Sequence, residues 1–334
     1  MSPIFNIESF ADSIFKIRSI QEFNGLSLEL FHYQCRENKV YAEYLAHLGR
    51  DVEETEHYNR IPFLPIAFYK LHKIVSGNMP EDKIFLSSGT GGMQSSKHYI
   101  LDLALYRRSF MEGFESFYGD PASYVFLGLL PSYLEREGSS LVYMIEKLME
   151  AGKHEESGFF LNEHDRLAGI LKSLSSSGKP AILIGVSFAL LDFAESQGFS
   201  LGDNIIIMET GGMKGRREEI TREDLHKRLQ EGLHTTHIHS EYGMTELLSQ
   251  AYSKGSGRFY PPPWMKILIR DIQDPFTLLP PGRSGAINII DLANIHSCAF
   301  IETQDIGRLF PDGSFEVLGR TDTSDIRGCS LLIS

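Results

Sequence analysis

The stretch AILIGVSFALLDFAESQGFSLGDNIIIM, residues 181–208, decides the fold class of this chain. Residues 181–186 form a short, continuous apolar run, which is typical of a strand buried on both faces, and residues 204–208 form a second one. Between them, the segment from about Phe188 to Gly198 predicts a helix. A strand, a helix and a second strand in this order indicate a crossover connection and therefore a largely parallel sheet.

Segments on both sides of this unit extend the alternation of helices and strands. On the N-terminal side, residues 141–150 predict an amphipathic helix that ends at Gly152. On the C-terminal side, Thr221 and Asp224 predict the capped start of a helix that ends at Gly232. The middle of the chain is therefore an α/β unit with helices flanking the sheet.

The pattern changes after Trp264, where short apolar segments are separated by Pro- and Gly-containing turns. This spacing predicts an antiparallel meander or small barrel that leans on the α/β body. The first 80 residues are mixed and mostly helical in pattern. The four expected C-terminal strands are residues 265–272, 285–292, 298–304 and 314–320.

Composition limits the classes of function. With 334 residues, 42% of them hydrophobic, the chain is long enough for one large globular domain, and its net charge of −12 argues against nucleic-acid binding as the main role. The three cysteines, Cys35, Cys298 and Cys329, are odd in number and show no short repeated spacing, so neither a disulfide framework nor a zinc site is expected. The start of the chain lacks a signal-peptide pattern and no apolar run is long enough to span a membrane, so we expect a cytoplasmic protein.

A glycine-rich loop follows a short apolar strand in IFLSSGTGGMQSSKHYI, residues 84–100. The Rossmann pattern fails because Gln94 stands at the third glycine position, and the P-loop pattern fails as well. Glycines nevertheless let successive backbone N–H groups converge on an anion, and hydroxyls and a lysine add donors and charge. A plain surface loop rich in small residues is the alternative. The candidate anion-binding residues are Ser87, Ser88, Gly89, Thr90, Gly91 and Lys97.

The segment HIHSEYGMTELLSQAYS, residues 237–253, contains EYGMTE, which resembles the tyrosine–glycine–x–threonine–glutamate signature of adenylate-forming enzymes. The loop SSGTGG is similar to the Ser/Thr/Gly loop of the same superfamily. The resemblance implies that ATP binds here with Tyr242 along the adenine and Gly243 allowing close approach. It further implies that Thr245 bonds the α-phosphate and that Glu246 holds Mg²⁺. A turn before an amphipathic helix would also account for these residues.

Further motifs of the superfamily follow in family order. The resemblance implies that Gly211 and Gly212 lie on the adenine side, that Asp305 accepts hydrogen bonds from both ribose hydroxyls, and that Arg320 adds charge near the ribose or phosphate. The segments that carry these motifs are METGGMKG (208–215), FIETQDIGRLF (300–310) and GRTDTSDIRG (319–328).

The N-terminal half resembles the acyl-protein synthetases (LuxE-type) of the bacterial luminescence fatty-acid reductase complex. This resemblance implies an α/β large domain over residues 1–318, with mostly parallel sheets flanked by helices, a small C-terminal antiparallel β subdomain, and no C-terminal small domain. It also implies a hinge-like tail over residues 319–334 in which Cys329 accepts the acyl group. The matching segments are residues 31–44, 61–77 and 127–144.

The resemblance as a whole implies ATP- and Mg²⁺-dependent activation of a fatty or other carboxylic acid to acyl-AMP, followed by transfer to a protein cysteine. An acyl reductase or an acyl carrier is the implied partner. His98 and His239 are candidates for charge neutralisation, although a hydrogen-bonded structural role is favoured for each. An acyl- or aryl-CoA ligase is the first alternative, and a non-catalytic nucleotide-binding partner of a reductase or carrier is the second.

Overall fold

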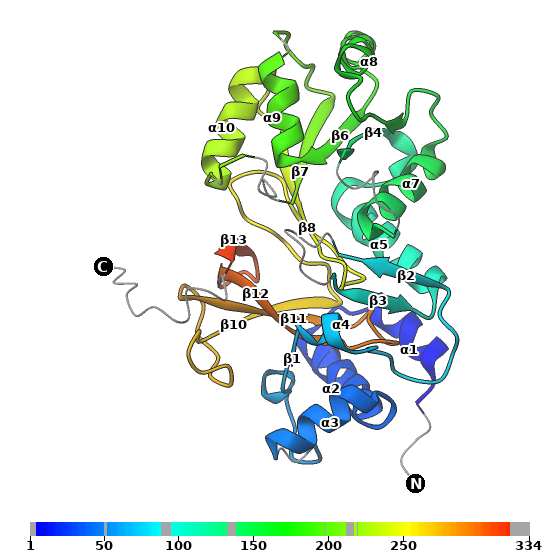
Figure 1. Ribbon diagram of the computed structural model, residues 1–334, viewed down its shortest axis with the longest axis vertical. Coiled ribbons are helices and arrows are strands. Elements are labelled where there is room, and N and C mark those ends of the chain that lie inside the picture. Colours follow the sequence, from blue (N-terminus) through cyan, green and yellow to red (C-terminus); the bar gives the residue numbers. More distant parts are fainter. Residues whose placement is uncertain are drawn as a thin grey trace.

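The computed structural model describes residues 5–49, 52–87, 95–131, 138–196, 198–211, 217–218 and 220–320 of the chain. Two larger sheets, each with its own set of helices, face each other, and a short hairpin lies beside their junction (Figure 1). The predicted α/β architecture with a C-terminal antiparallel part is confirmed.

The first sheet has six strands in the order β5-β4-β6-β7-β8-β9, and all of them are parallel except β9. Helices α9 and α10 lie on one side of it, and α5 and α7 lie on the other (Figure 1). The strands are β4 (Val125–Leu129), β5 (Gly158–Phe159), β6 (Ala181–Val186), β7 (Ile205–Thr210), β8 (Ile238–Tyr242) and β9 (Ala251–Ser253). The helices are α5 (Leu103–Tyr118), α7 (Ser140–Gly152), α8 (His164–Ser177), α9 (Ser187–Ser196) and α10 (Arg222–Leu233), with the 3₁₀ turn Pro121–Ser123 before β4.

The predicted strand–helix–strand unit is β6-α9-β7, and its strands are parallel neighbours. The predicted end of α10 at Gly232 is wrong by one residue. The helix continues to Leu233 and closes at His234, which adopts the left-handed conformation with φ 48°. Gly232 is needed for packing instead, since a Cβ there would lie 2.9 Å from the Cβ of Ala194 on α9.

The second sheet is an antiparallel meander, β10-β11-β12-β13, which confirms the antiparallel arrangement expected after Trp264. A two-residue strand from the N-terminal part, β1, pairs in parallel with β12 and was not predicted. The strands of the second sheet are β1 (Leu64–Pro65), β10 (Met265–Arg270), β11 (Ser284–Asp291), β12 (Phe300–Leu309) and β13 (Phe315–Arg320). Residues 321–334, most of the predicted tail, lie outside the described residues.

The N-terminal helices pack against this second sheet, and β2 and β3 form the separate two-stranded hairpin (Figure 1). The elements are α1 (Ile7–Ile14), α2 (Ile20–Glu37), α3 (Lys39–Leu48), the 3₁₀ turn Tyr58–Arg60, α4 (Phe68–Leu71), β2 (Lys83–Leu86) and β3 (Lys97–Ile100). Within the described part of the chain, no helix has both the length and the apolar character to cross a membrane.

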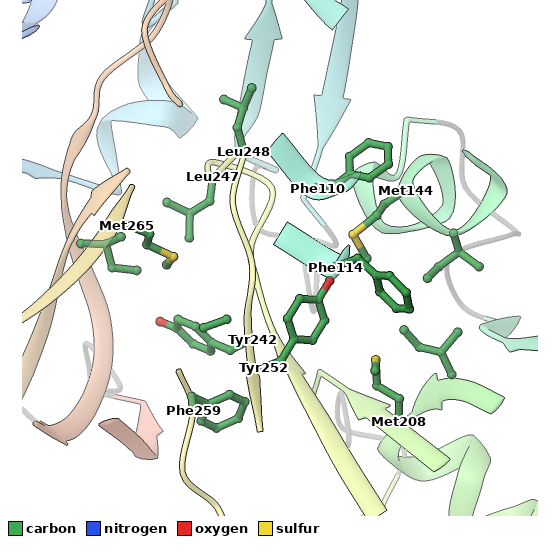
Figure 2. Packing of buried hydrophobic residues seen from close by; sticks show 14 of the residues in the cluster. Phe110, Phe114, Met144, Met208, Tyr242, Leu247, Leu248, Tyr252, Phe259 and Met265 are labelled. Atoms are coloured by element: carbon green, nitrogen blue, oxygen red, sulfur yellow. The ribbon is translucent and has the colours of Figure 1, made fainter. Parts of the chain in front are cut away.

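Buried aromatic side chains join the two sheets (Figure 2). The ring of Tyr242, at the end of β8, lies 5.8 Å from that of Phe259 and 5.4 Å from that of Phe315 on β13. Burying rings of this size contributes a large share of the folding free energy. It also fixes the end of β8 against the second sheet, where the sequence motifs meet.

Candidate functional site

The base of the glycine-rich loop is closed by two serines. The Ser87 N–H donates to the Ser96 carbonyl oxygen at 3.0 Å, and the Ser96 N–H donates to Ser87 Oγ at 2.8 Å. These bonds extend the β2–β3 pairing by one step beyond Leu86 and Lys97. The predicted site residues Ser88, Gly89, Thr90, Gly91, Gly212 and Cys329 lie outside the described residues.

The start of β3 contacts the EYGMTE segment directly. The Ser96 hydroxyl hydrogen-bonds the Glu246 carboxyl group, and His98 Nδ1 donates to the Thr245 carbonyl oxygen at 2.8 Å. Lys97, between these two buried residues, is exposed, as the alternation of side chains along a strand requires. Thr245 and Glu246 therefore lie at the base of the glycine-rich loop, on the side opposite to Lys97.

The Glu246 carboxyl group is almost fully buried, with 5% of the residue exposed. Burial raises the pKa of Glu246, while the hydrogen bond from Ser96 lowers it. A carboxylate that burial destabilises gains from a nearby cation, because a positive charge favours the ionised form.

The segment after Glu246 is not the amphipathic helix that the alternative interpretation required. Residues 247–250 are irregular backbone with a bend at Leu248, and they lead into β9. The buried carboxylate of Asp291 accepts hydrogen bonds from the N–H groups of Leu248 and Ser249, at 2.8 and 3.0 Å. Backbone donors satisfied by a side chain do not need a helix.

Three predicted residues meet at one point between the two sheets. The Tyr242 hydroxyl donates to Asp305 Oδ2 at 2.7 Å, and Arg320 Nε donates to Asp305 Oδ1 at 3.1 Å. Asp305 lies on β12 and Arg320 lies opposite it on β13. Burial raises the pKa of the Tyr242 hydroxyl well above its usual value, and the nearby Asp305 charge raises it further, so this hydroxyl stays a donor.

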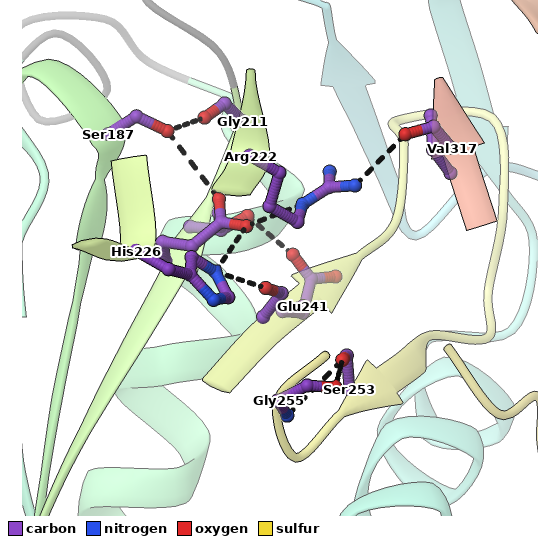
Figure 3. Close-up of polar contacts among 11 residues, drawn as sticks. Ser187, Gly211, Arg222, His226, Glu241, Ser253, Gly255 and Val317 are labelled. Atoms are coloured by element: carbon purple, nitrogen blue, oxygen red, sulfur yellow. Dashed lines mark hydrogen bonds and ion pairs between the residues drawn. The ribbon is translucent and has the colours of Figure 1, made fainter. Parts of the chain in front are cut away.

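A second buried carboxylate, Glu209 at the carboxyl end of β7, was missed by sequence reasoning; its partners Arg222 and His226 are labelled in Figure 3. Arg222 Nε donates to Glu209 Oε1 at 3.0 Å, and His226 Nε2 lies 3.7 Å from the same oxygen. Burial raises the pKa of Glu209, but the His226 hydrogen bond and the Arg222 charge outweigh it and hold the pKa below its ordinary value. Arg222 also donates to the Val317 carbonyl oxygen at 3.1 Å, which ties α10 to β13. The sequence did contain a signal for this site, since the charged Glu209 directly follows an apolar run that predicts a buried strand.

Glu241 lies on the neighbouring strand β8, and its pKa is raised, whereas that of Glu209 is lowered. Its carboxyl group accepts a hydrogen bond from the Thr210 hydroxyl, yet burial and the neighbouring Glu209 raise its pKa to about 7. The side chain folds under Gly243, where a Cβ would come within 2.4 Å of Glu241 Oε1. The close approach expected at Gly243 therefore exists within the protein itself.

We expect Glu241→Gln to change the pH dependence of stability. The folded protein favours protonated Glu241, so this group costs stability as pH rises from its ordinary pKa of 4.5 to about 7. Glutamine cannot ionise, so the variant should gain on the order of 2–3 kcal/mol relative to the unsubstituted protein between pH 5 and pH 8. Urea unfolding at both pH values measures this. The exposed Glu231→Gln serves as control, and a difference independent of pH would contradict the prediction.

The two candidate histidines are both buried and hydrogen-bonded. His239 Nδ1 lies 3.2 Å from the Tyr118 hydroxyl and its ring stacks on that tyrosine. Burial lowers the pKa of His98 to about 4 and that of His239 to about 4. Both rings are therefore neutral at pH 7, and neither supplies positive charge.

The two described cysteines are poor nucleophiles. Burial raises the pKa of the Cys35 thiol to about 12 and that of the Cys298 thiol to about 12. Acyl transfer to cysteine requires the thiolate, so neither side chain suits this chemistry.

Comparison with known proteins identifies the fold. No family model matches the chain, and no curated protein matches it. Among solved structures, it is similar to ATP-bound MatB from Rhodopseudomonas palustris, with a TM-score of 0.54 and 17% identity over 73% of this chain and 49% of that chain. It is also similar to o-succinylbenzoate CoA synthetase (MenE) from Bacillus subtilis, bound to its product analogue OSB-NCoA, with a TM-score of 0.52 and 17% identity over 73% of this chain and 50% of that chain.

The chain therefore shares the fold of the parts of these two structures that it matches. The chain spans about half the length of the solved structures it matches.

Proposed function

We propose that this protein is an ATP-dependent acyl-protein synthetase. It activates a fatty or other carboxylic acid to acyl-AMP and then transfers the acyl group to a protein cysteine. In this proposal the reaction requires ATP and Mg²⁺, and an acyl reductase or acyl carrier is the partner that receives the product.

One observation supports the proposal most. Three distant segments, each of which carries a motif expected on resemblance to bind one nucleotide, are in contact. Ser96 at the base of the glycine-rich loop hydrogen-bonds Glu246, and Tyr242 from the same segment as Glu246 hydrogen-bonds Asp305. A single nucleotide whose phosphates lie toward Glu246 and whose ribose lies toward Asp305 would use both contacts.

The first step is adenylation. A carboxylate oxygen of the acid attacks the α-phosphorus of ATP, the bond from that phosphorus to the bridging oxygen breaks, and pyrophosphate leaves. Thr245 and the loop N–H groups donate to the phosphate oxygens as negative charge develops. Asp305 orients the ribose, and Arg320 adds positive charge beside it.

Mg²⁺ fits this site as an ion shared with the nucleotide. The described residues contain no group of three or more His, Cys, Asp or Glu side chains able to hold a metal ion, so the protein offers Glu246 as a single carboxylate. Mg²⁺ commonly binds through one or two carboxylates together with phosphate oxygens and water. When bound, it neutralises phosphate charge and polarises the phosphorus.

The second step is thioester formation. The sulfur of a cysteine thiolate attacks the acyl carbonyl carbon, the bond from that carbon to the AMP oxygen breaks, and the thiol proton goes to solvent. Cys329 is the proposed acceptor, on its resemblance to the acyl-protein synthetase cysteine and because the partly buried Cys35 thiol and the buried Cys298 thiol both have a raised pKa.

The second candidate is an acyl- or aryl-CoA ligase, which shares the adenylation step. The likeness in fold to o-succinylbenzoate CoA synthetase favours it. The two candidates differ in the thiol that receives the acyl group, so they are separable by product analysis.

ATP–pyrophosphate exchange over a panel of carboxylic acids tests the proposal. We expect exchange with at least one acid, and labelled protein when that acid, ATP and no CoA are supplied. Exchange with release of acyl-CoA and no labelled protein favours the ligase. ATP binding without exchange for any acid overturns the synthetase and leaves a non-catalytic nucleotide-binding partner.

Asp305→Ala should raise the KM for ATP. A charged hydrogen-bonded contact to a ligand contributes roughly 1.5–3 kcal/mol, which corresponds to an increase of about 10- to 150-fold. Calorimetric titration with ATP measures the effect directly. The matched control is Asp203→Ala at a fully exposed position. An unchanged ATP affinity in Asp305→Ala would remove this residue from the site.

A further inference from the structure

Two buried side chains hold successive carbonyl groups of the Thr245–Glu246 segment. His98 on β3 donates from Nδ1 to the Thr245 carbonyl oxygen at 2.8 Å, and Asn294, in the connection between β11 and β12, donates from Nδ2 to the Glu246 carbonyl oxygen at 2.8 Å. Both residues are only 1% exposed. They come from different sheets, so the segment is fixed from two sides.

The remaining polar atom of each side chain makes no hydrogen bond of ordinary geometry in the described part of the chain, but the two side chains interact, since Asn294 raises the pKa of His98 against the effect of burial. These atoms are His98 Nε2 and Asn294 Oδ1, both fully buried. Because Nδ1 carries the ring proton that is donated to Thr245, Nε2 of the neutral ring is an acceptor, and Asn294 Oδ1 is an acceptor as well. Two acceptors cannot satisfy each other, so Asn294 favours the protonated form of His98, but burial outweighs this effect and lowers the pKa of the ring to about 4.

Both side chains line one small cavity. Its volume is about 10 Å³, close to the roughly 10–15 Å³ that a single water molecule needs. Its other lining residues include Asp102, Leu248, His296 and Ser297.

We propose that His98 and Asn294 form a polar clamp that positions Thr245 and Glu246. The proposal rests on the proposed function, because it assigns the clamp to the residues that would meet phosphate and Mg²⁺. His98 and Asn294 are positioning residues, since they act through backbone carbonyls and touch neither nucleotide nor acid. The adjacent Ser96 hydroxyl orients the Glu246 carboxyl group itself.

The first experiment measures the clamp without using activity. Hydrogen exchange over residues 243–250 should be faster in His98→Leu than in the unsubstituted protein, by about three- to tenfold for the loss of one neutral hydrogen bond. The amides of Leu248 and Ser249, held by Asp291, are the reporters. His98→Asn should restore slow exchange because its amide can replace the Nδ1 donor.

Asn294→Asp is the second variant, and it keeps the side-chain shape while replacing the Nδ2 donor by an acceptor. His296→Gln is the matched control, because His296 lines the same cavity but has no hydrogen bond to Thr245 or Glu246 in the described structure. Exchange over β6 serves as the internal reference for global stability. Unchanged exchange over residues 243–250 in both His98→Leu and Asn294→Asp would overturn the clamp.

The second experiment links the clamp to the reaction. In His98→Leu, the Mg²⁺ concentration for half-maximal ATP–pyrophosphate exchange should rise by about three- to tenfold, and His98→Asn should restore it. A variant that only lowers stability, with unchanged Mg²⁺ dependence, would overturn the positioning role. If the unsubstituted protein lacks ATP–pyrophosphate exchange, the proposed function fails, and hydrogen exchange still decides the clamp.

Discussion

Cys329→Ser is expected to abolish thioester-labelled protein while leaving acyl-AMP formation intact. Adenylation uses Thr245, Glu246 and Asp305, none of which this substitution touches, whereas thioester formation requires a sulfur nucleophile. Incubation with ATP and a labelled acid, followed by hydroxylamine treatment, measures the label. ATP–pyrophosphate exchange measures the first step on the same preparation.

The other two cysteines supply the matched controls. Cys35→Ser and Cys298→Ser should keep the label, because burial raises the pKa of each thiol to about 12 and leaves almost no thiolate at pH 7. Hydroxylamine-sensitive label on Cys329→Ser would show that another residue is the acceptor. Label that disappears only when Cys298 is replaced would assign the transfer to a buried thiol and refute the proposed role of Cys329.

Glu246→Gln is expected to lower kcat for adenylation by roughly 10²–10³-fold, the range observed when one group that stabilises transition-state charge is removed. The amide keeps the shape of the side chain and can still contact Ser96, so folding stability should change little. It no longer offers a negative charge to Mg²⁺. The carboxylate is buried, so no neighbouring solvent-exposed group replaces it.

Exchange rates measured at limiting and saturating Mg²⁺ separate the causes of this loss. If Glu246 binds the ion, the defect should be larger at limiting Mg²⁺. Thermal unfolding of the same variant checks that the fold is intact. Ordinary exchange at limiting Mg²⁺ would exclude Glu246 as the metal-binding residue.

The parallel sheet was predictable because its central strands are buried on both faces. Residues 181–186 are apolar throughout, and every one of them is buried in β6. The convergence of Tyr242 with Asp305 was also predictable, but only from the order of motifs that resemble a family. Local pattern says nothing of which strands from the two halves of the chain come together.

What the sequence could not predict depends on contacts between distant residues. The irregular segment after Glu246 is stabilised because Asp291, 43 residues away from Leu248, accepts hydrogen bonds from the N–H groups of Leu248 and Ser249. His98 was singled out in the sequence with a hydrogen-bonded role favoured, but its partner, the Thr245 carbonyl oxygen 147 residues away, could not be predicted. The close packing at Gly232 depends on Ala194 of another helix, and a glycine near the end of a helix predicts a stop when only local sequence is read.

The pairing of β1 with β12 joins segments far apart in the chain, and we expect contacts of this kind to slow folding. The Ala299 N–H donates a hydrogen bond to Gln34 Oε1 on α2, and this contact spans 265 residues. Strand β1 belongs to a sheet whose other strands begin only at Met265. Non-local contacts of this kind raise the contact order and lower the folding rate. During synthesis at the ribosome, the apolar faces of α2 and α3 stay exposed until the residues beyond 260 have been made. Exposed apolar surface of this kind promotes aggregation and chaperone binding. A fragment comprising the first 80 residues, expressed alone, should therefore fail to fold.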